Sequence, residues 1–448
     1  MHDVAIVICN YNKREYVISC IESILKSNFK NYDLIVVDNA STDDSVAVIR
    51  ENYGDRLTLL VNEKNLGGSG GFNRGMAYAM SQKKYKYIHL LDNDVVVDAD
   101  AIGKLYEFME AHPGAGACGS LVLRMDFPET IQDYGAVISV KDFGAKALYG
   151  GEVVTSALPE FVECDYIAAC SAMYRCAALE TAGLIEEDYF IYWDDIAFCW
   201  KLRLAGYPIY ACAASRVLHK VGKLGRNSSF ALYYFFRNKV HSIVKYCTDD
   251  EYKELAEDIV TRIFRTFAVN TKSNNAIYAY FHALNDALND IRGKADSYKL
   301  EQRNDPELMF ANRLVGARSI LILFSKDFIT LETLIVNIRN ISPDIDIAIA
   351  SGGESMPRID NATILTETPT YKEYDVVLKL CNHILDLADY DRTLIYCDRY
   401  LNQLVDDEDF DFVMDLDNHF KFFYKVFYPF VKSKLDDLRQ KYGHTLSE

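Results

Sequence analysis

Residues 87–94 read Tyr-Ile-His-Leu-Leu-Asp-Asn-Asp, an apolar run that passes directly into two carboxylates. A run this short and apolar is typical of a buried strand. Side chains two positions apart point the same way in an extended chain, so we expect Asp92 and Asp94 to converge. Converging carboxylates repel each other unless a cation lies between them, and a solvated acidic turn is the alternative. The stretch predicts a strand that ends at a site for Mg²⁺ or Mn²⁺.

The segments before this stretch repeat a strand-and-helix pattern. Short apolar runs predict strands at residues 4–9, 34–37 and 57–61, and the helical spacing of apolar residues marks a helix at residues 16–25. Strands that alternate with helices of this length favour an α/β fold with a mainly parallel, doubly wound sheet. Ligands bind such sheets at the carboxyl ends of the strands, where the polar clusters of this chain also fall.

The rest of the chain predicts two further parts. Helical patterning is followed by a smaller α/β unit of unknown role, with strands expected at residues 319–324, 346–350 and 393–397. We therefore expect an α/β domain over residues 1–228, a helical segment over residues 229–314, and a C-terminal α/β unit over residues 315–448.

Composition narrows the classes of protein. The chain has 448 residues, 50% of them apolar, and its 48 Lys and Arg against 65 Asp and Glu give a net charge of −17. This excludes a disordered or collagen-like chain and argues against a nucleic-acid partner, which needs basic surface. The eleven Cys are an odd count without a Cys-x-x-Cys pair. With no signal peptide and no apolar run of membrane-spanning length, they predict reduced thiols and a cytoplasmic location.

One long segment is basic, although the whole chain carries a negative net charge. Residues 196–248 contain no Asp or Glu, and we expect this basic segment to face something anionic. Its cations are Lys201, Arg203, Arg216, Lys220, Lys223, Arg226, Arg237, Lys239 and Lys245. With the cations around it, the aromatic segment at residues 230–236 suits a membrane surface or a lipid diphosphate acceptor, or else packing on the core. The aromatic segment at residues 420–430 suits core packing or a dimer contact, with anchoring at a membrane interface as the alternative. Pro429 argues against one straight helix in the second of these.

A second acidic group, Trp193-Asp194-Asp195, precedes a helix expected at residues 196–205. An N-terminal cap explains one of the two carboxylates but leaves the other to be accounted for. The aromatic run at residues 189–193 suits sugar stacking and would raise the pKa of a neighbouring carboxyl toward use as a general base. The same run could equally form core.

Two weaker signals complete the set. A glycine-rich loop at residues 67–71 precedes a helix expected at residues 73–81, and with Arg74 it suits either phosphate binding or a plain surface position. It is not a P-loop, because no Lys follows its last glycine, and it is not the Gly-x-Gly-x-x-Gly turn of nicotinamide enzymes. His219 follows an expected strand and either completes the metal site or is structural.

Six motifs in this order resemble the family 2 inverting glycosyltransferases, and most of all their rhamnosyl- and galactofuranosyltransferase branch. They are residues 4–10, 38–43, 65–75 and 92–94, Trp193-Asp194-Asp195, and His219. The resemblance covers about residues 1–250. It implies the GT-A fold, in which one Rossmann-like sheet is joined to an acceptor half, and it leaves the C-terminal unit unassigned.

The resemblance also implies roles for individual residues. Asp195 would be the general base, and Trp193 and Asp194 would bind the acceptor. Mn²⁺ or Mg²⁺ would be held by Asp92, Asp94 and His219. The nucleotide-sugar donor would be bound by Cys9, Asn10, Tyr11, Asp38, Asn65, Gly67, Arg74, Asp92 and Asn93.

The predicted activity is the inverting transfer of a sugar from a nucleoside diphosphate to a hydroxyl of a surface polysaccharide or lipid-linked glycan. From the resemblance, dTDP-rhamnose is the first expected donor and UDP-galactofuranose the second. A nucleotidyltransferase is disfavoured because residues 9–14 contain no glycine, and a non-catalytic binding protein because Asp94, Asp195 and His219 are all present. A homo-oligomer and peripheral contact with the inner face of the cell membrane stay open as alternatives.

Overall fold

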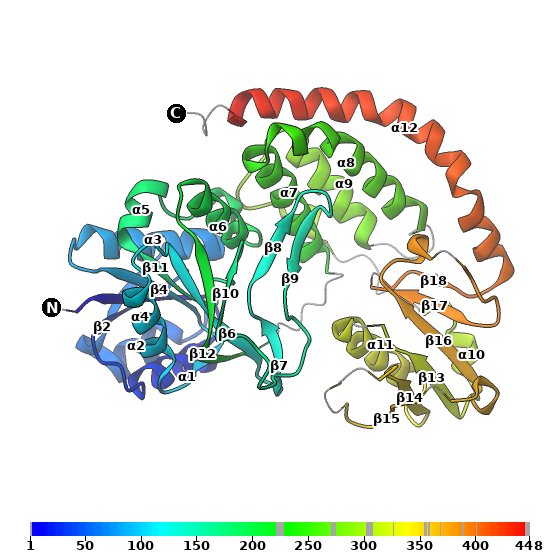
Figure 1. Ribbon diagram of the computed structural model, residues 1–448, viewed down its shortest axis with the longest axis horizontal. Coiled ribbons are helices and arrows are strands. Elements are labelled where there is room, and N and C mark those ends of the chain that lie inside the picture. Colours follow the sequence, from blue (N-terminus) through cyan, green and yellow to red (C-terminus); the bar gives the residue numbers. More distant parts are fainter. Residues whose placement is uncertain are drawn as a thin grey trace.

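The computed structural model describes residues 2–220, 228–269, 275–301, 308–325, 327–353, 356, 359–367, 369–387, 389–399 and 401–443. Figure 1 shows three parts: an α/β part in blue and cyan that holds the N-terminus, a group of helices in green, and a second α/β part in yellow and orange. The last helix, α12 (Asp407–Tyr442), is drawn in red and runs back from the second α/β part across the green helices.

The first sheet has the strand order β10-β12-β6-β11-β4-β1-β2-β3, with β5 paired to β12 and β7 paired to β6. Its strands are β1 (Val4–Asn10), β2 (Tyr32–Asp38), β3 (Thr58–Val61), β4 (Tyr87–Asp92), β5 (Val95–Val97), β6 (Ala117–Arg124), β7 (Phe127–Asp133), β10 (Phe161–Cys164), β11 (Ser171–Arg175) and β12 (Ile209–His219). Strand β1 pairs in parallel with β2 and β4, whereas β11 is antiparallel to β4 and β6. This mainly parallel sheet confirms the predicted GT-A fold class.

Helices cover both faces of this sheet. One face packs against α1 (Arg14–Leu25), α2 (Ser45–Tyr53) and α4 (Ala101–Ala111), and the other against α3 (Gly67–Ser81), α5 (Cys176–Ala182) and α6 (Asp194–Leu204). Residues 4–8 of β1 have no solvent exposure, as expected for a strand covered on both sides. Each buried Val or Ile side chain there stabilises the fold by about 1.5–3 kcal/mol.

The glycine-rich loop predicted at residues 67–71 is wrong, because α3 already begins at Gly67. The glycines allow this helix to pack closely against β1. A Cβ atom on Gly71 would lie 2.2 Å from the Cys9 Sγ, and one on Gly75 would lie 2.3 Å from a Val7 methyl carbon. Helix–sheet contact therefore demands glycine here, and the sequence pattern alone resembled a flexible loop.

The remaining elements form a helical group and a second sheet. The helices of the group are α7 (Ser229–Tyr246), α8 (Asp249–Val269) and α9 (Asn275–Leu288), and the hairpin β8 (Ala136–Ser139) and β9 (Gly144–Ala147) lies beside them in Figure 1. The second sheet has the order β15-β14-β13-β16-β17-β18 and is parallel except for β18. Its elements are β13 (Ser319–Leu323), β14 (Asp346–Ala350), β15 (Thr363–Leu365), β16 (Val376–Cys381), β17 (Ile395–Asp398), β18 (Gln403–Leu404), α10 (Ala311–Leu314) and α11 (Phe328–Ile341). Single 3₁₀ turns span Gly54–Arg56, Glu187–Tyr189, Ser297–Leu300, Tyr371–Glu373 and Ile384–Asp386.

Helix α12 ties the C-terminal part to the helical group. Val431, Leu435 and Leu438 are buried in one apolar cluster with α7, α8 and α9. The Arg439 guanidinium donates 2.8 Å hydrogen bonds to the Val244 carbonyl and to the Asp249 carboxylate. The helix continues through Pro429, so the proline does not end it, and Figure 1 shows the helix as an arch.

Three cations of the basic segment form ion pairs with carboxylates of this chain. Lys245 pairs with Glu186 at 2.7 Å, Arg203 with Asp165 at 2.7 Å, and Lys220 with Asp126 at 2.5 Å. Lys223 and Arg226 lie outside the described residues. Within the aromatic part, Tyr233, Tyr234 and Phe236 are buried, whereas Phe235 is exposed. Helix α7 is therefore a core helix, which accounts for its aromatic residues.

The second aromatic segment, on α12, is divided between core and surface. Phe423, Phe427 and Tyr428 pack against the helical group, while Phe422 and Phe430 are exposed. In the part of the chain that the structure describes, no helix combines the length and the apolar character that crossing a bilayer requires.

Candidate active site

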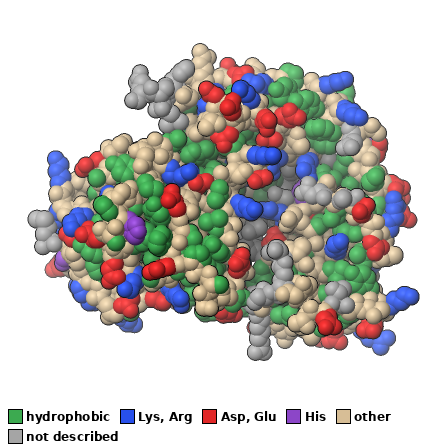
Figure 2. All heavy atoms as spheres, in the orientation of Figure 1, with side chains coloured by type: hydrophobic (Ala, Val, Ile, Leu, Met, Phe, Trp, Pro, Cys, Tyr) green, Lys and Arg blue, Asp and Glu red, His purple; other side chains and the backbone are tan. Residues whose placement is uncertain are grey.

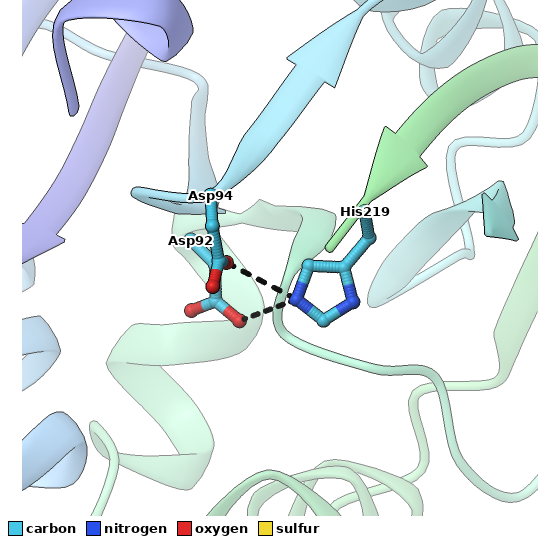
Figure 3. Close-up of side chains that lie close together, drawn as sticks. All are labelled: Asp92, Asp94 and His219. Carbon is cyan, nitrogen blue, oxygen red and sulfur yellow. Dashed lines mark ion pairs between the residues drawn. The ribbon is translucent and has the colours of Figure 1, made fainter. Parts of the chain in front are cut away.

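Two acidic residues and one histidine meet at the carboxyl end of the first sheet. Asp92 ends β4, Asp94 follows two residues later, and His219 ends β12 (Figure 3). The His219 Nε2 lies 3.2 Å from an Asp94 oxygen and 3.8 Å from an Asp92 oxygen. Pairing of His219 with Val95 across β12 and β5 sets this position. One donor atom from each of the three side chains falls within 4.8 Å of the others, as the sequence motifs predicted.

The electrostatics of this group favour a bound cation. Burial raises the pKa of Asp92 to about 6, and the neighbouring Asp94 adds to the shift. Burial opposes ionisation of Asp94 as well, but hydrogen bonds from His219 and Lys13 outweigh it and hold its pKa at about 2. The Lys13 Nζ lies 2.5 Å from an Asp94 oxygen. Two carboxylate oxygens and an imidazole nitrogen suit Mn²⁺ or Mg²⁺, so the residues present fit the predicted metal.

Gln132, on β7, contacts the far side of the His219 ring. Its amide nitrogen is placed 2.7 Å from the His219 Nδ1, and its Oε1 is buried without a hydrogen-bond partner among the described residues. Rotation of this amide by 180° would let Oε1 accept a hydrogen bond from the Nδ1–H group and would leave the Nε2 lone pair free for a metal. Gln132 therefore selects which ring nitrogen of His219 carries the proton.

The second acidic group begins α6. Trp193 is the N-cap residue and its side chain makes no capping hydrogen bond, so neither Asp194 nor Asp195 is the N-cap that the sequence allowed for. An Asp194 oxygen accepts a 2.9 Å hydrogen bond from the Ser69 hydroxyl of α3. Asp195 accepts hydrogen bonds from the Tyr166 hydroxyl at 3.0 Å and from the Ile196 amide at 2.8 Å.

Burial raises the pKa of Asp195 to about 7, and the charge of Asp194 adds to the shift. Burial also raises the pKa of Asp194. A carboxyl with a pKa near neutral is suited to accept a proton from a hydroxyl, because it is partly ionised at physiological pH and still basic enough to hold the proton.

A two-residue backbone segment joins the two acidic groups. The Ala169 amide donates a hydrogen bond to the Asp195 carboxylate, and the Cys170 carbonyl accepts one from the Asp92 amide at 3.1 Å. Burial raises the pKa of the Cys170 thiol, and the charges of Asp92, Asp94 and Asp195 contribute to the shift. The metal group and the proposed base therefore lie around the same buried residue.

The loop before α6 has a strained backbone, and a side chain of α7 holds it through hydrogen bonds. Phe190, Tyr192 and Trp193 all have positive φ angles between 63° and 67°, which cost about 1–3 kcal/mol each for such side chains. The Asn238 side-chain amide of α7 lies within 2.9 Å of the carbonyls of Tyr189, Ile191 and Tyr192. These bonds explain how the aromatic run can turn Asp194 and Asp195 toward the sheet.

The predicted donor residues line the ends of β1 and β2. The Asn10 amide donates to the Asp38 carboxylate at 3.1 Å, and the Asn93 amide donates to Asn10 at 2.8 Å. Asp38 is fully buried and also accepts a 2.8 Å hydrogen bond from the Ser41 amide. Tyr11 is exposed at this edge. Asn10, Asp38 and Asn93 therefore form one network beside the acidic group.

The other predicted donor residues lie at the start of α3 and along it. The Asn65 side chain accepts from the Gly67 amide at 2.7 Å. Gly67 has a φ of 76°, and a Cβ atom there would lie 2.0 Å from the Phe190 carbonyl oxygen. The exposed Arg74 donates a hydrogen bond to the Asn62 side chain, which follows β3. Cys9 packs against Gly71 at the same helix.

Several residues of this site were missed by the sequence patterns. Lys13 contacts Asp94, Gln132 contacts His219, Tyr166 contacts Asp195, and Asn238 supports the loop before Asp194. The first three come from segments without a motif, so their side chains gave no signal. Asn238 lies in the basic, aromatic segment, where an isolated polar residue in a core helix could have drawn attention.

Comparisons with known proteins relate this chain to enzymes that transfer sugars. Residues 5–180 match the model of Glycosyl transferase family 2. The chain is 23% identical over 246 residues to the low-salt glycan biosynthesis hexosyltransferase Agl10 of Haloferax volcanii, across 53% of this chain and 75% of that protein. It is 22% identical over 257 residues to the UDP-Glc:alpha-D-GlcNAc-diphosphoundecaprenol beta-1,3-glucosyltransferase WfaP of Escherichia coli, across 55% of this chain and 96% of that protein. The crystal structure of S. aureus TarS 1–349 aligns with a TM-score of 0.43 at 16% identity, over 65% of this chain and 81% of that one.

The family match contains the parallel strands β1 to β4 together with Asp38, Asp92 and Asp94, while Asp195 and His219 lie beyond it. Both curated relatives are named as transferases of sugars. The chain is thus a glycosyltransferase whose N-terminal α/β part belongs to glycosyl transferase family 2.

Proposed function

We propose that this glycosyltransferase moves a hexose from a nucleoside diphosphate donor to an acceptor hydroxyl in a single, inverting displacement. The observation that carries the proposal is the Ala169-Cys170 segment, which holds Asp195 through one residue and the Asp92 backbone through the next. A metal-binding group for the diphosphate and a carboxylate for the acceptor are thereby kept side by side. One base and one displacement are sufficient for inversion, and no second nucleophilic carboxylate is required.

Asp195 is the general base in this proposal. It accepts the proton of the attacking hydroxyl, and its pKa of about 7 suits that transfer. Tyr166 donates to one oxygen and the Ile196 amide donates to the other, so the carboxylate is held in one orientation. Trp193 and Asp194 bind the acceptor in this proposal. A hydrogen bond from the Ser69 hydroxyl orients Asp194.

Asp92, Asp94 and His219 hold the divalent metal in this proposal, and Mn²⁺ or Mg²⁺ supplies positive charge that neutralises the departing diphosphate. Asn10, Asp38 and Asn93 bind the nucleoside end through their shared network. Arg74 is exposed and donates one hydrogen bond to Asn62, and its other guanidinium donors are proposed to meet the diphosphate. Lys13, which already pairs with Asp94, is a second cation at the donor end.

The donor and acceptor are the finer parts of the proposal. The sequence resemblance favours dTDP-rhamnose first and UDP-galactofuranose second. The name of WfaP adds UDP-glucose as a donor and a lipid diphosphate as the carrier of the acceptor sugar. We propose a glycan or lipid-linked glycan acceptor for this chain too, which would place the reaction in the cytoplasm or at the inner face of the cell membrane.

A donor panel tests the proposal. The purified chain is incubated with Mn²⁺, with a lipid-linked sugar as acceptor, and with dTDP-rhamnose, UDP-galactofuranose, UDP-glucose or UDP-GlcNAc, and release of the nucleoside diphosphate is followed. We expect one donor to be turned over by the wild type and none by Asp195→Asn. Nuclear magnetic resonance of the product should show an anomeric configuration opposite to that of the donor. Retention of configuration, or equal turnover by the variant, would contradict the mechanism.

A further inference from the structure

The C-terminal α/β part contacts the first sheet at the hairpin formed by β6 and β7, which lies on the side that faces α11 in Figure 1. Arg124 ends β6, and its Nη2 donates hydrogen bonds to both carboxylate oxygens of Glu332 on α11, at 3.0 Å and 2.8 Å. Phe127 begins β7 and meets Phe328 of α11 edge to face, with 5.9 Å between the ring centres. Phe127 also packs against the apolar core of the C-terminal part. Helix α11 therefore holds the turn of this hairpin.

The ion pair at this contact is sheltered from solvent. Figure 2 shows Lys, Arg, Asp and Glu side chains spread over the visible face, where water weakens their mutual attraction. The Arg124 side chain, in contrast, is only 8% exposed, and its guanidinium lies 5.0 Å and 4.8 Å from the centres of the Phe127 and Phe328 rings. Loss of Glu332 would leave a nearly buried charge without its carboxylate partner, which is costly. The position of the hairpin therefore depends on Glu332.

The same hairpin reaches His219 at two points. Arg124 is the register partner of His219 across β6 and β12, and the next residue, Met125, donates a 2.9 Å hydrogen bond from its amide to the His219 carbonyl. Gln132, near the other end of β7, contacts the His219 Nδ1 at 2.7 Å. Both the backbone and the ring of His219 therefore depend on where the hairpin lies.

Asp133, the last residue of β7, supports the other half of the site. Its carboxylate accepts hydrogen bonds from the Gly135 amide at 3.2 Å and from the Ala168 amide. Ala168 is followed by Ala169, whose amide donates to the Asp195 carboxylate. Strand β7 thus contacts the metal group through one residue and the support of the proposed base through the next.

Strand β7 is bonded along both sides. It pairs with β6 on one side. On the other side, the Ile131 amide donates to the Glu152 carbonyl and the Val154 amide donates to the Glu129 carbonyl, both at 2.8 Å. A strand held in this way moves as a unit, and rigid elements of this kind carry coupling between distant sites. A shift at the α11 contact is therefore passed along β7 to Gln132 and Asp133.

We propose that the C-terminal α/β part positions the metal centre, because α11 holds the β6–β7 hairpin and the hairpin holds His219 through Gln132. The inference rests on the proposed function, since it requires a divalent metal at Asp92, Asp94 and His219. Glu332 is a positioning residue, as it touches none of these ligands. The proposal gives the C-terminal part a role in donor binding that no sequence motif indicated.

Manganese titration of the full chain with UDP tests the proposal, with free Mn²⁺ followed by electron paramagnetic resonance. Glu332→Gln should weaken manganese binding by about two- to thirtyfold, the range for residues that act through others. Glu332→Asp keeps the carboxylate and should recover part of the loss. The matched control is Asp411→Asn, which removes a negative charge and an exposed ion pair with Arg392 from the same part and should bind as the wild type does.

A double variant tests the route through the hairpin. In a Gln132→Ala background the contact with the His219 ring is already lost, so Glu332→Gln should weaken manganese binding less than it does in the wild type. Losses that add in full would overturn the proposed route.

Hydrogen exchange of the metal-free proteins supplies a readout that needs no metal. We expect the amides of residues 131–133 and of Ala169 to exchange faster in Glu332→Gln than in the wild type or in Asp411→Asn. A lower melting temperature of Glu332→Gln with unchanged exchange and unchanged manganese affinity would mean that Glu332 only fastens the two parts together, and it would overturn the proposal. Failure of the wild type to bind Mn²⁺ with UDP would instead count against the proposed function.

Discussion

The two sheets of this enzyme differ in the surroundings of the acidic residues that end their parallel strands. In the first sheet, Asp92 and Asp94 meet with few hydrogen-bond donors nearby, and His219 and Lys13 are the described cations that offset their charge. In the second sheet, Asp398 ends β17 and is fully buried, yet it is satisfied locally. It accepts bonds from the Ile384 amide at 3.3 Å and from the backbone and side chain of Asn402 at 3.0 Å.

The difference shows that a parallel sheet alone does not make a cation site. What decides is whether the fold supplies donors to the acid at the strand end.

The largest expected effect comes from the proposed base. Asp195→Asn should lower the transfer rate by about 10²–10⁴-fold, the usual contribution of a general base. Manganese-dependent binding of UDP should persist, because Asp195 is not part of the metal group. Turnover and calorimetry on the same preparation measure both. A variant with wild-type turnover would remove Asp195 from the mechanism.

The metal group gives the next effect. Asp94→Ala should weaken manganese-dependent UDP binding by more than about 100-fold, since even the loss of a residue that only supports a ligand costs about 10–100-fold. The change also leaves Lys13 and His219 without their closest carboxylate. Titration heats with Mn²⁺ and UDP provide the measurement. Heats equal to those of the wild type would refute the assignment of Asp94 as a ligand.

A substitution of Gln132 should have a smaller effect on metal binding at the same site. Gln132→Ala removes the side chain that contacts the His219 Nδ1, so the ring loses its preferred protonation and metal affinity should fall about 10–100-fold. Thr181→Ala, on the outer face of α5, serves as the control. An unchanged manganese affinity in Gln132→Ala would show that His219 needs no support.

The pH dependence of the rate tests the electrostatics of the base. Burial raises the pKa of Asp195 to about 7, so the carboxyl is protonated below that pH and cannot accept a proton. The rate should rise about tenfold per pH unit up to pH ~7 and then level off. Asp194→Asn removes a negative neighbour and should move this rise to lower pH. A rate that stays flat from about pH 5 to about pH 8 would contradict the assignment.

The smallest effect on catalysis is expected at the second sheet. Asp398→Asn replaces an acceptor of three hydrogen bonds, so it should lower the free energy of unfolding by about 1–3 kcal/mol. Manganese-dependent UDP binding should stay at the wild-type level. Thermal unfolding measures the loss of stability, and calorimetry measures the binding of UDP. Loss of UDP binding in a folded Asp398→Asn protein would mean that the two sheet edges are not independent.

Much of the first sheet could be predicted because its signals are local. Residues 4–9 and 87–91 are apolar runs in which apolar and polar residues do not alternate. This pattern is typical of a strand that is buried on both faces. The pairing of Asp92 with Asp94 follows from the period of a strand, and His219 was placed with them by resemblance. The glycine segment at residues 67–71 was mistaken for a loop, because glycine required by close helix–sheet packing and glycine required by a flexible loop look identical in sequence.

Taken by itself, the sequence determined the α/β class, the acidic ends of the strands and the family resemblance, because each depends on neighbours a few residues apart. The tertiary structure decided which groups share a site. Only folding brings Ala169 to Asp195, Gln132 to His219 and Asn238 to the strained loop before α6. It also places Glu332 of the C-terminal part against Arg124 of the first sheet. Contacts between residues so far apart in the chain depend on how whole elements pack, and no local pattern encodes that packing.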